Sequence, residues 1–86
     1  MARALTVQRT LVTPGERERF FERMKRKQQH YSRAKCHFWV FEEVSLPGAF
    51  LEFVEAPDTD TLARAHAASP DPGLDPARIY REVELS

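Results

Sequence analysis

The chain has little of what marks a secreted or membrane protein. Its 86 residues include one cysteine, Cys36, which excludes an internal disulfide and predicts a cytoplasmic location. No apolar run approaches the ~20 residues of a membrane span, and residues 1–4 lack the apolar stretch of a signal peptide. We therefore expect no membrane interaction and a single small globular domain, residues 1–86, with a marginal core.

Basic residues are also missing from a long stretch. No Lys or Arg occurs between residues 36 and 63, whereas eight of the thirteen lie between residues 16 and 35. The stretch without basic residues carries the acidic side chains Glu42, Glu43, Glu52, Glu55, Asp58 and Asp60. This separation is typical of a solvated basic helix beside an acidic hairpin. It also suits complementary docking, within one subunit or between two, and both interpretations stay open.

The first third of the chain predicts a strand and then a helix. Apolar and polar residues alternate over residues 5–12, which is typical of a strand. A Pro-Gly pair follows, and Thr13 with Glu16 three residues later forms a capping-box pattern. We therefore expect a helix over residues 16–31, with an apolar stripe made of Phe20, Phe21, Met24 and Tyr31.

Residues 36–55, CHFWVFEEVSLPGAFLEFVE, predict a β-hairpin that is apolar on both faces. Phe38 and Val40 share one face of its first strand, while Trp39 and Phe41 share the other. The turn is predicted at Pro47-Gly48, because proline presets φ and glycine accepts a positive φ.

The last third of the chain predicts a second helix and a last strand. Asp58 or Asp60 can cap a short helix over residues 59–68. A loop rich in Pro, Gly and Asp follows. Alternation returns over residues 78–85, with Ile79, Val83 and Leu85 on one face.

The resulting order, β-α-β-β-α-β, predicts an α+β fold. Its expected form is ferredoxin-like, a four-stranded antiparallel sheet with both helices on one face. Two helices on one face leave the aromatic side chains of the other face bare, and monomers rarely keep such a patch. We therefore expect a homodimer through the sheet face, burying two or three aromatic side chains per subunit at about 1.5–3 kcal/mol each.

The third strand and second helix also resemble a known family. The stretch EAPDTDTLARAHAAS, together with the topology, resembles the dimeric α+β barrel superfamily and its antibiotic-biosynthesis-monooxygenase-like branch. The matching residues are the run Glu52-Phe53-Val54-Glu55 and the helix residues Leu62 and Ala65-His66, with Val54 where the branch has tryptophan. The resemblance implies a ferredoxin-like subunit that dimerises into a barrel. It also implies a small-molecule site between sheet and helices, and monooxygenase-like chemistry without a cofactor.

His66 is the candidate catalytic residue. It lies one turn after Leu62, which predicts that it faces the sheet, and imidazole titrates near neutral pH. A buried histidine with a purely structural role is the alternative. The predicted ligand-binding residues are Trp39 and Phe53 as an aromatic wall, Arg9 and Glu52 as polar anchors, and His37 and Tyr31.

The polar anchors follow from an expected clash of charges. A two- or three-residue turn would place Glu52 opposite Glu43 or Glu42, and like charges directly opposed destabilise a sheet. Arg9, on the expected neighbouring strand, would relieve this by pairing with Glu52. Such a pair is either a structural ion pair or a polar anchor inside the site.

Two kinds of partner are not expected. The histidines and Cys36 do not have the spacing of a zinc site, so we predict no metal. Residues 48–53 are similar to the aromatic strand of RNA-recognition motifs, but the hairpin is acidic, the wrong sign for phosphates. We therefore predict no nucleic acid.

These patterns predict a small-molecule-binding dimeric α+β barrel protein with a small apolar or aromatic ligand. Its more specific form is a cofactor-independent, monooxygenase-like oxidoreductase. The alternative is a non-catalytic ligand-sensing or protein-interaction module that docks through the basic helix 16–31. A cavity containing His66 favours the first prediction, and a packed interior with salt-sensitive binding by the helix favours the second.

Overall fold

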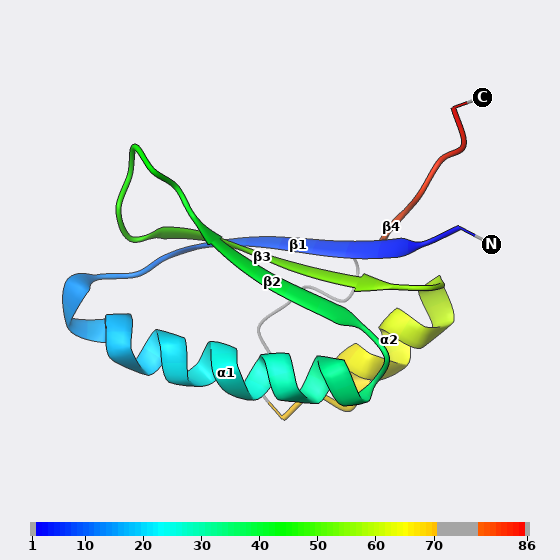
Figure 1. The fold of residues 1–86 in the computed structure, drawn as a ribbon, viewed down its shortest axis with the longest axis horizontal. Coiled ribbons are helices and arrows are strands. Elements are labelled where there is room, and N and C mark those ends of the chain that lie inside the picture. Colours follow the sequence, from blue (N-terminus) through cyan, green and yellow to red (C-terminus); the bar gives the residue numbers. More distant parts are fainter. Residues whose placement is uncertain (1, 71–77, 86) are drawn as a thin grey trace.

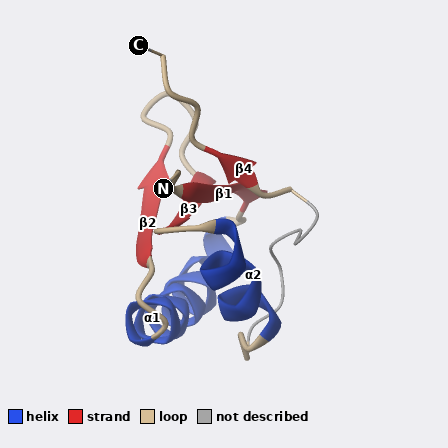
Figure 2. Ribbon diagram, turned by 90° about the vertical axis from the view of Figure 1, so that its right-hand side faces the viewer, coloured by secondary structure: helices blue, strands red, loops and turns tan. Residues whose placement is uncertain are grey.

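The computed structural model describes residues 2–70 and 78–85 of the chain. Its elements are β1 (Ala4–Leu11), a short 3-10 turn (Pro14–Glu16), α1 (Arg17–Arg33), β2 (His37–Glu42), β3 (Ala49–Ala56), α2 (Thr59–Ala67) and β4 (Tyr80–Arg81). The four strands form one antiparallel sheet in the order β2-β3-β1-β4, and both helices lie on the same side of it (Figures 1 and 2). The predicted α+β class is confirmed, and the arrangement is compatible with a ferredoxin-like fold.

The start of α1 differs from the capping box that the sequence predicts. The Thr13 side chain makes no capping hydrogen bond, and its carbonyl instead accepts from the Glu16 N–H at 2.9 Å. This bond closes the 3-10 turn that Pro14 opens, so α1 itself begins at Arg17. The intervening turn keeps the Thr13 hydroxyl away from the first N–H groups of α1, and the predicted box is therefore wrong.

The end of α1 is set by backbone hydrogen bonds. The Cys36 N–H donates to the Tyr31 carbonyl at 2.8 Å and the Lys35 N–H donates to the Ser32 carbonyl at 3.2 Å, which is a Schellman motif. Lys35 takes φ 64°, a conformation that glycine adopts more easily. The motif carries Cys36 into the core at the start of β2, where its side chain is 3% exposed and burial raises the pKa of the thiol.

The hairpin turn is longer than predicted. The connection between β2 and β3 spans residues 43–48, and Val40 faces Glu52 across the ladder. The expected pairing of Glu52 with Glu42 or Glu43 is therefore wrong, because a longer loop shifts the register. Gly48 has φ 96°, and a Cβ there would lie 2.7 Å from the Val12 carbonyl oxygen, so this position requires glycine.

The second helix matches its prediction closely, and the last strand does not. Asp58 caps α2 by accepting a hydrogen bond from the Thr61 N–H at 2.7 Å. The strand expected over residues 78–85 is reduced to Tyr80–Arg81, because antiparallel pairing brings Glu82 beside Arg3 and the segment then passes the start of β1. Val83 and Leu85 are 71% and 94% exposed. Residues 71–77 of the predicted loop lie outside the described residues.

Alternate residues of the sheet face two different environments. The inner face, which the helices cover, packs into the core: Ala4, Phe38, Phe50, Val54 and Ala56 with Phe20, Met24, Tyr31, Leu62 and Ala65. The outer face points away from the helices and carries the cross-strand rows Leu5–Glu55–His37, Val7–Phe53–Trp39 and Arg9–Leu51–Phe41. Trp39 and Phe41 are 43% and 57% exposed, and no described residue of the chain covers them as the helices cover the inner face (Figure 2).

Candidate functional site

His66 lies between two hydroxyl groups on the inner side of the sheet. Its Nε2 lies 2.8 Å from the Thr6 Oγ1, and its Nδ1 lies 2.8 Å from the Tyr31 Oη. The three side chains come from α2, β1 and α1, so the packing of both helices on the sheet is what brings them together. The predicted orientation of His66 toward the sheet is confirmed.

The protonation state of this group follows from its surroundings. Burial lowers the pKa of His66 most, and electrostatic repulsion from Lys27 and His30 lowers it further. Burial also raises the pKa of Tyr31 to about 12. Near pH 7 the imidazole and the phenol are therefore both neutral, and the imidazole can accept a proton.

A buried ion pair lies beside these groups. The Lys27 Nζ donates to a Glu52 carboxylate oxygen at 2.8 Å, and the two side chains are 3% and 2% exposed. Gln8 faces Glu52 in the ladder, and its Oε1 is buried without a hydrogen-bond partner among the described residues. We call these side chains the inner polar cluster: Thr6, Gln8, Lys27, Tyr31, Glu52 and His66.

The predicted ion pair between Arg9 and Glu52 is wrong, because each of the two side chains pairs with a different residue. Arg9 faces Leu51 in the ladder, so its side chain projects to the outer face and pairs with Glu43 at 3.4 Å. Glu52 projects inward and meets Lys27 of α1. Sequence reasoning missed Lys27, although it continues the apolar spacing of Phe20, Met24 and Tyr31.

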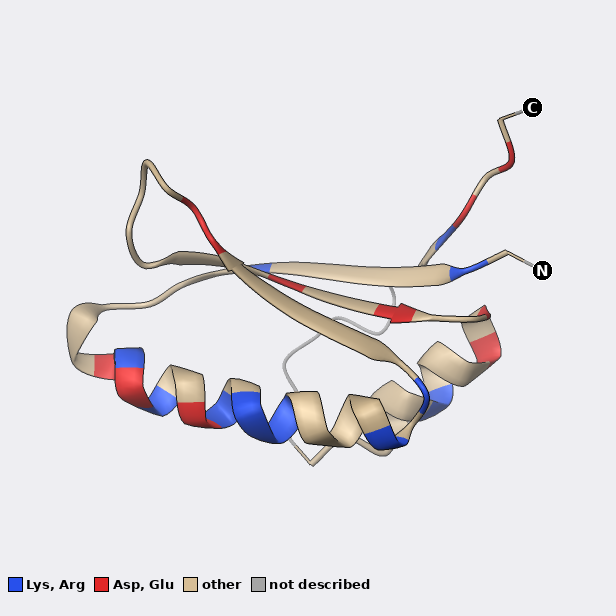
Figure 3. Cartoon of the chain, in the orientation of Figure 1, with Lys and Arg blue, Asp and Glu red and all other residues tan. Residues whose placement is uncertain are grey.

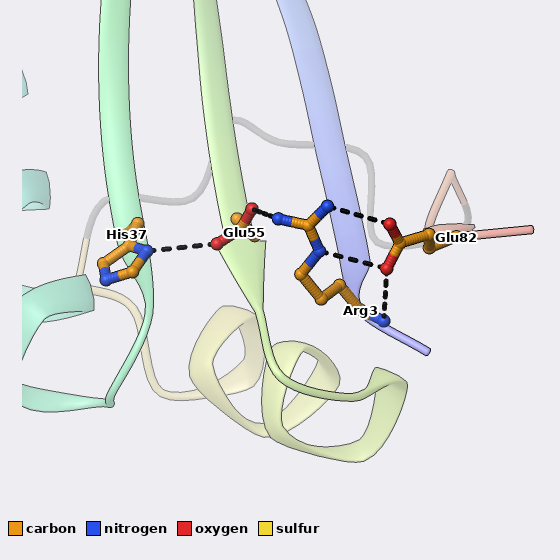
Figure 4. A network of polar contacts seen from close by, with 4 residues as sticks. All are labelled: Arg3, His37, Glu55 and Glu82. Atoms are coloured by element: carbon orange, nitrogen blue, oxygen red, sulfur yellow. Dashed lines mark hydrogen bonds and ion pairs between the residues drawn. The ribbon is translucent and has the colours of Figure 1, made fainter. Parts of the chain in front are cut away.

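On the outer face, four polar side chains form a network across the sheet (Figure 4). His37 Nδ1 lies 3.0 Å from one oxygen of Glu55, and Arg3 donates to the other at 3.1 Å. Arg3 also donates through Nε at 3.0 Å and Nη2 at 2.8 Å to Glu82. The network therefore ties β2, β3 and β1 to the residue that follows β4.

The predicted site residues are divided between the two sides of the sheet. His66, Tyr31 and Glu52 lie in the inner polar cluster. The other four lie on the outer face: Trp39, Phe53, His37 and Arg9. The structure does not bring all seven into one site, because successive residues of a strand point to opposite faces. Their roles stay predictions.

The basic helix α1 forms ion pairs with acidic residues of its own chain. Arg17 makes a bidentate ion pair with Glu42 at 2.8 and 3.0 Å, and this pair with the Gly48 N–H lowers the pKa of Glu42 to about 2. Lys27 is engaged by Glu52. Arg17 and Lys27 of the basic helix thus bind acidic residues of the hairpin, as the interpretation of docking within one chain predicts. Figure 3 shows the basic residues along α1.

A groove runs between α1 and the edge of β2 that faces away from β3. Two adjoining hollows of about 390 and 280 Å³ form it and share Gln28, Phe38 and Trp39. The remaining lining residues are Phe21, Met24, Lys25, Ser32, Cys36, His37 and Val40. His66 does not line either hollow.

Within residues 2–70 and 78–85, no three His, Cys, Asp or Glu side chains gather as a metal site would require. No helix in the same ranges has the length and apolar character needed to cross a membrane. Comparison with protein-family models, with curated proteins and with solved structures finds no match to this chain.

Proposed function

We propose that this chain is a small-molecule-binding protein that acts as a homodimer, a dimeric α+β barrel of two ferredoxin-like subunits. The observation that carries the proposal is the uncovered outer face, where Trp39, Phe41 and Leu51 are 36–57% exposed. Monomers rarely keep an apolar patch of this kind, and a two-fold axis that packs two outer faces together removes both patches from water.

The inner polar cluster is the ligand site in this proposal. An 86-residue chain has a small core, and a buried ion pair stabilises it less than apolar side chains of the same volume would. Interior polar groups that break the apolar pattern are concentrated at functional sites. A small aromatic ligand with one hydroxyl group suits this cluster. It would replace Thr6 or Tyr31 as a partner of the imidazole, because both ring nitrogens already have partners at 2.8 Å.

The more specific proposal is monooxygenase-like chemistry without a cofactor, as the family resemblance implies. His66 would accept the proton of the ligand, since its lowered pKa keeps the ring neutral near pH 7. The charge of Lys27, which already acts on His66, would favour the anion that forms. The cytoplasmic location stays a prediction.

Oligomeric state tests the first half of the proposal. We expect sedimentation equilibrium of the full chain to give a dimer, and the emission of Trp39 to move to longer wavelength as dilution exposes it. Phe41→Glu should give a folded monomer, because it places a charge on the apolar outer face that the proposed interface buries. Val44→Glu is the matched control, since Val44 is 97% exposed in the hairpin loop. A full chain that sediments as a monomer contradicts the proposed dimer.

Ligand binding tests the second half. We expect 1-naphthol, a planar aromatic with one hydroxyl, to produce saturable shifts in the imidazole NMR signals of His66. The shifts at Tyr31 should disappear in His66→Phe. Signals that change linearly with 1-naphthol, or that move only on the outer face, contradict a site at the inner polar cluster.

A further inference from the structure

We propose that the segment Glu82–Leu85 of one copy adds as a strand to the free edge of β2 in a second copy. This inference rests on the proposed homodimer and names the segment and the edge that would join its two sheets.

The receiving edge belongs to β2, which ends the sheet order β2-β3-β1-β4. One side of β2 pairs with β3 over residues 37–42, and no described strand pairs with the other side. Such an edge presents unpaired N–H and C=O groups, which recruit an extended segment by β-strand addition.

The groove beside this edge has the chemistry of a specific acceptor. Its floor is apolar, with Met24 and Phe38 buried and Phe21 and Val40 half-buried. Its rim carries Lys25 and Gln28, and no acidic residue is among the side chains that line either hollow. An extended segment with apolar side chains at alternate positions suits it, because those side chains enter the groove while the side chains between them point to the opposite side of the strand and stay in water.

The segment after β4 has this alternation. It reads Glu82-Val83-Glu84-Leu85, and Val83 and Leu85 are 71% and 94% exposed. Beyond β4 the segment runs away from the sheet (Figure 1). Its direction is fixed at the start, because Arg3 holds Glu82 through three hydrogen bonds (Figure 4). Four extended residues span about 13 Å, which fits within the length of about 20 Å of the six-residue β2.

The chain cannot supply this strand to its own β2. β4 and β2 lie at opposite edges of the sheet, three strand spacings or about 14 Å apart. The segment would also have to reverse its direction at Glu82, where Arg3 binds it. A second copy is therefore the source, and its own tail can add to the first copy by the same two-fold symmetry.

Paramagnetic broadening between copies tests the contact directly. A nitroxide is attached to an unlabelled Cys36→Ala, Ser86→Cys chain, which is mixed with ¹⁵N-labelled Cys36→Ala chain. Only contacts between copies can then broaden the observed amides. We expect the strongest broadening at residues 37–42. Broadening confined to other strands, in a sample that sediments as a dimer, overturns the proposal.

Dimer affinity provides the independent test. We expect Val83→Asp with Leu85→Asp to weaken dimerisation about tenfold or more, since two apolar side chains lose their groove. Val44→Asp should leave the affinity unchanged. If the tail variant dimerises like the wild type, strand addition is wrong and the homodimer stands. If the wild-type chain is a monomer, both proposals are wrong.

Discussion

The inner and outer faces of the sheet are built from alternate residues of the same strands, yet hydrophobicity does not decide which side is buried. Phe50 on the inner face is 2% exposed, whereas Phe41 on the outer face is 57% exposed. The polar residues Thr6, Lys27 and Glu52 are, by contrast, only 1–2% exposed. Which side is covered depends on where the two connecting helices pack, and the side without helices keeps its apolar side chains partly exposed.

A matched pair of phenylalanines measures this difference most directly. We expect Phe50→Ala to lower the free energy of unfolding by about 3–5 kcal/mol, because it leaves a cavity under α1. Phe41→Ala should cost less than about 1 kcal/mol in the dissociated monomer. Urea denaturation of both variants at low protein concentration gives the two values. Equal losses would mean that the outer face is packed within the subunit.

The ion pairs of the two faces sharpen the comparison. Lys27→Met leaves the Glu52 carboxylate buried without its cation and should cost about 3 kcal/mol. Arg9→Met breaks an exposed pair and should cost less than about 1 kcal/mol. Thermal unfolding measures both.

A second substitution keeps the Lys27 test valid. Lys27→Met with Glu52→Leu removes both charges and should recover most of the lost stability. If the double variant is as unstable as Lys27→Met alone, the loss comes from packing and not from the unpaired carboxylate.

The smallest expected effect is the pH dependence of the inner face. His66 has a pKa below its ordinary 6.5, so the unfolded chain binds the proton more readily than the folded chain does. The contribution of His66 to stability is therefore fully present above pH 6.5 and is lost as pH falls through the lowered pKa. The slope is at most about 1.4 kcal/mol per pH unit.

Unfolding free energies measured between about pH 7.5 and about pH 5.5, on either side of the ordinary histidine pKa of 6.5, should show this decline. His66→Gln should flatten the curve. Glu42 and Glu82 do not affect this pH range, because their pKa is lowered from 4.5 to about 2. Their contribution to stability is fully present above pH 4.5 and is lost only as pH falls toward that lowered pKa. Identical slopes in the wild type and His66→Gln would contradict the assignment.

Local sequence patterns were enough to predict some of the elements. The Asp58 cap, the helix after it and the alternation of β1 each depend on a few neighbouring residues, and the structure reproduces them. Gly48 with its positive φ was likewise indicated by the Pro-Gly pair.

What the sequence did not predict depends on distances between elements. The loop over residues 43–48 shifts the hairpin register, and with it the partner of Glu52. Lys27 was counted with the solvated charges because of its residue type, although its spacing places it among the buried side chains of α1. The division of the candidate site has another origin, since Trp39 lies on the outer face of the sheet and His66 contacts the inner face, so the sheet itself separates them.

The burial of Cys36 has a practical consequence. As the one thiol of the chain, buried where α1 meets β2, it is protected from alkylation until that junction opens. The unmodified protein therefore carries its own reporter of opening. The rate at which iodoacetamide adds one mass increment would compare free, dimeric and ligand-loaded forms, even in a crude extract, without introducing a probe.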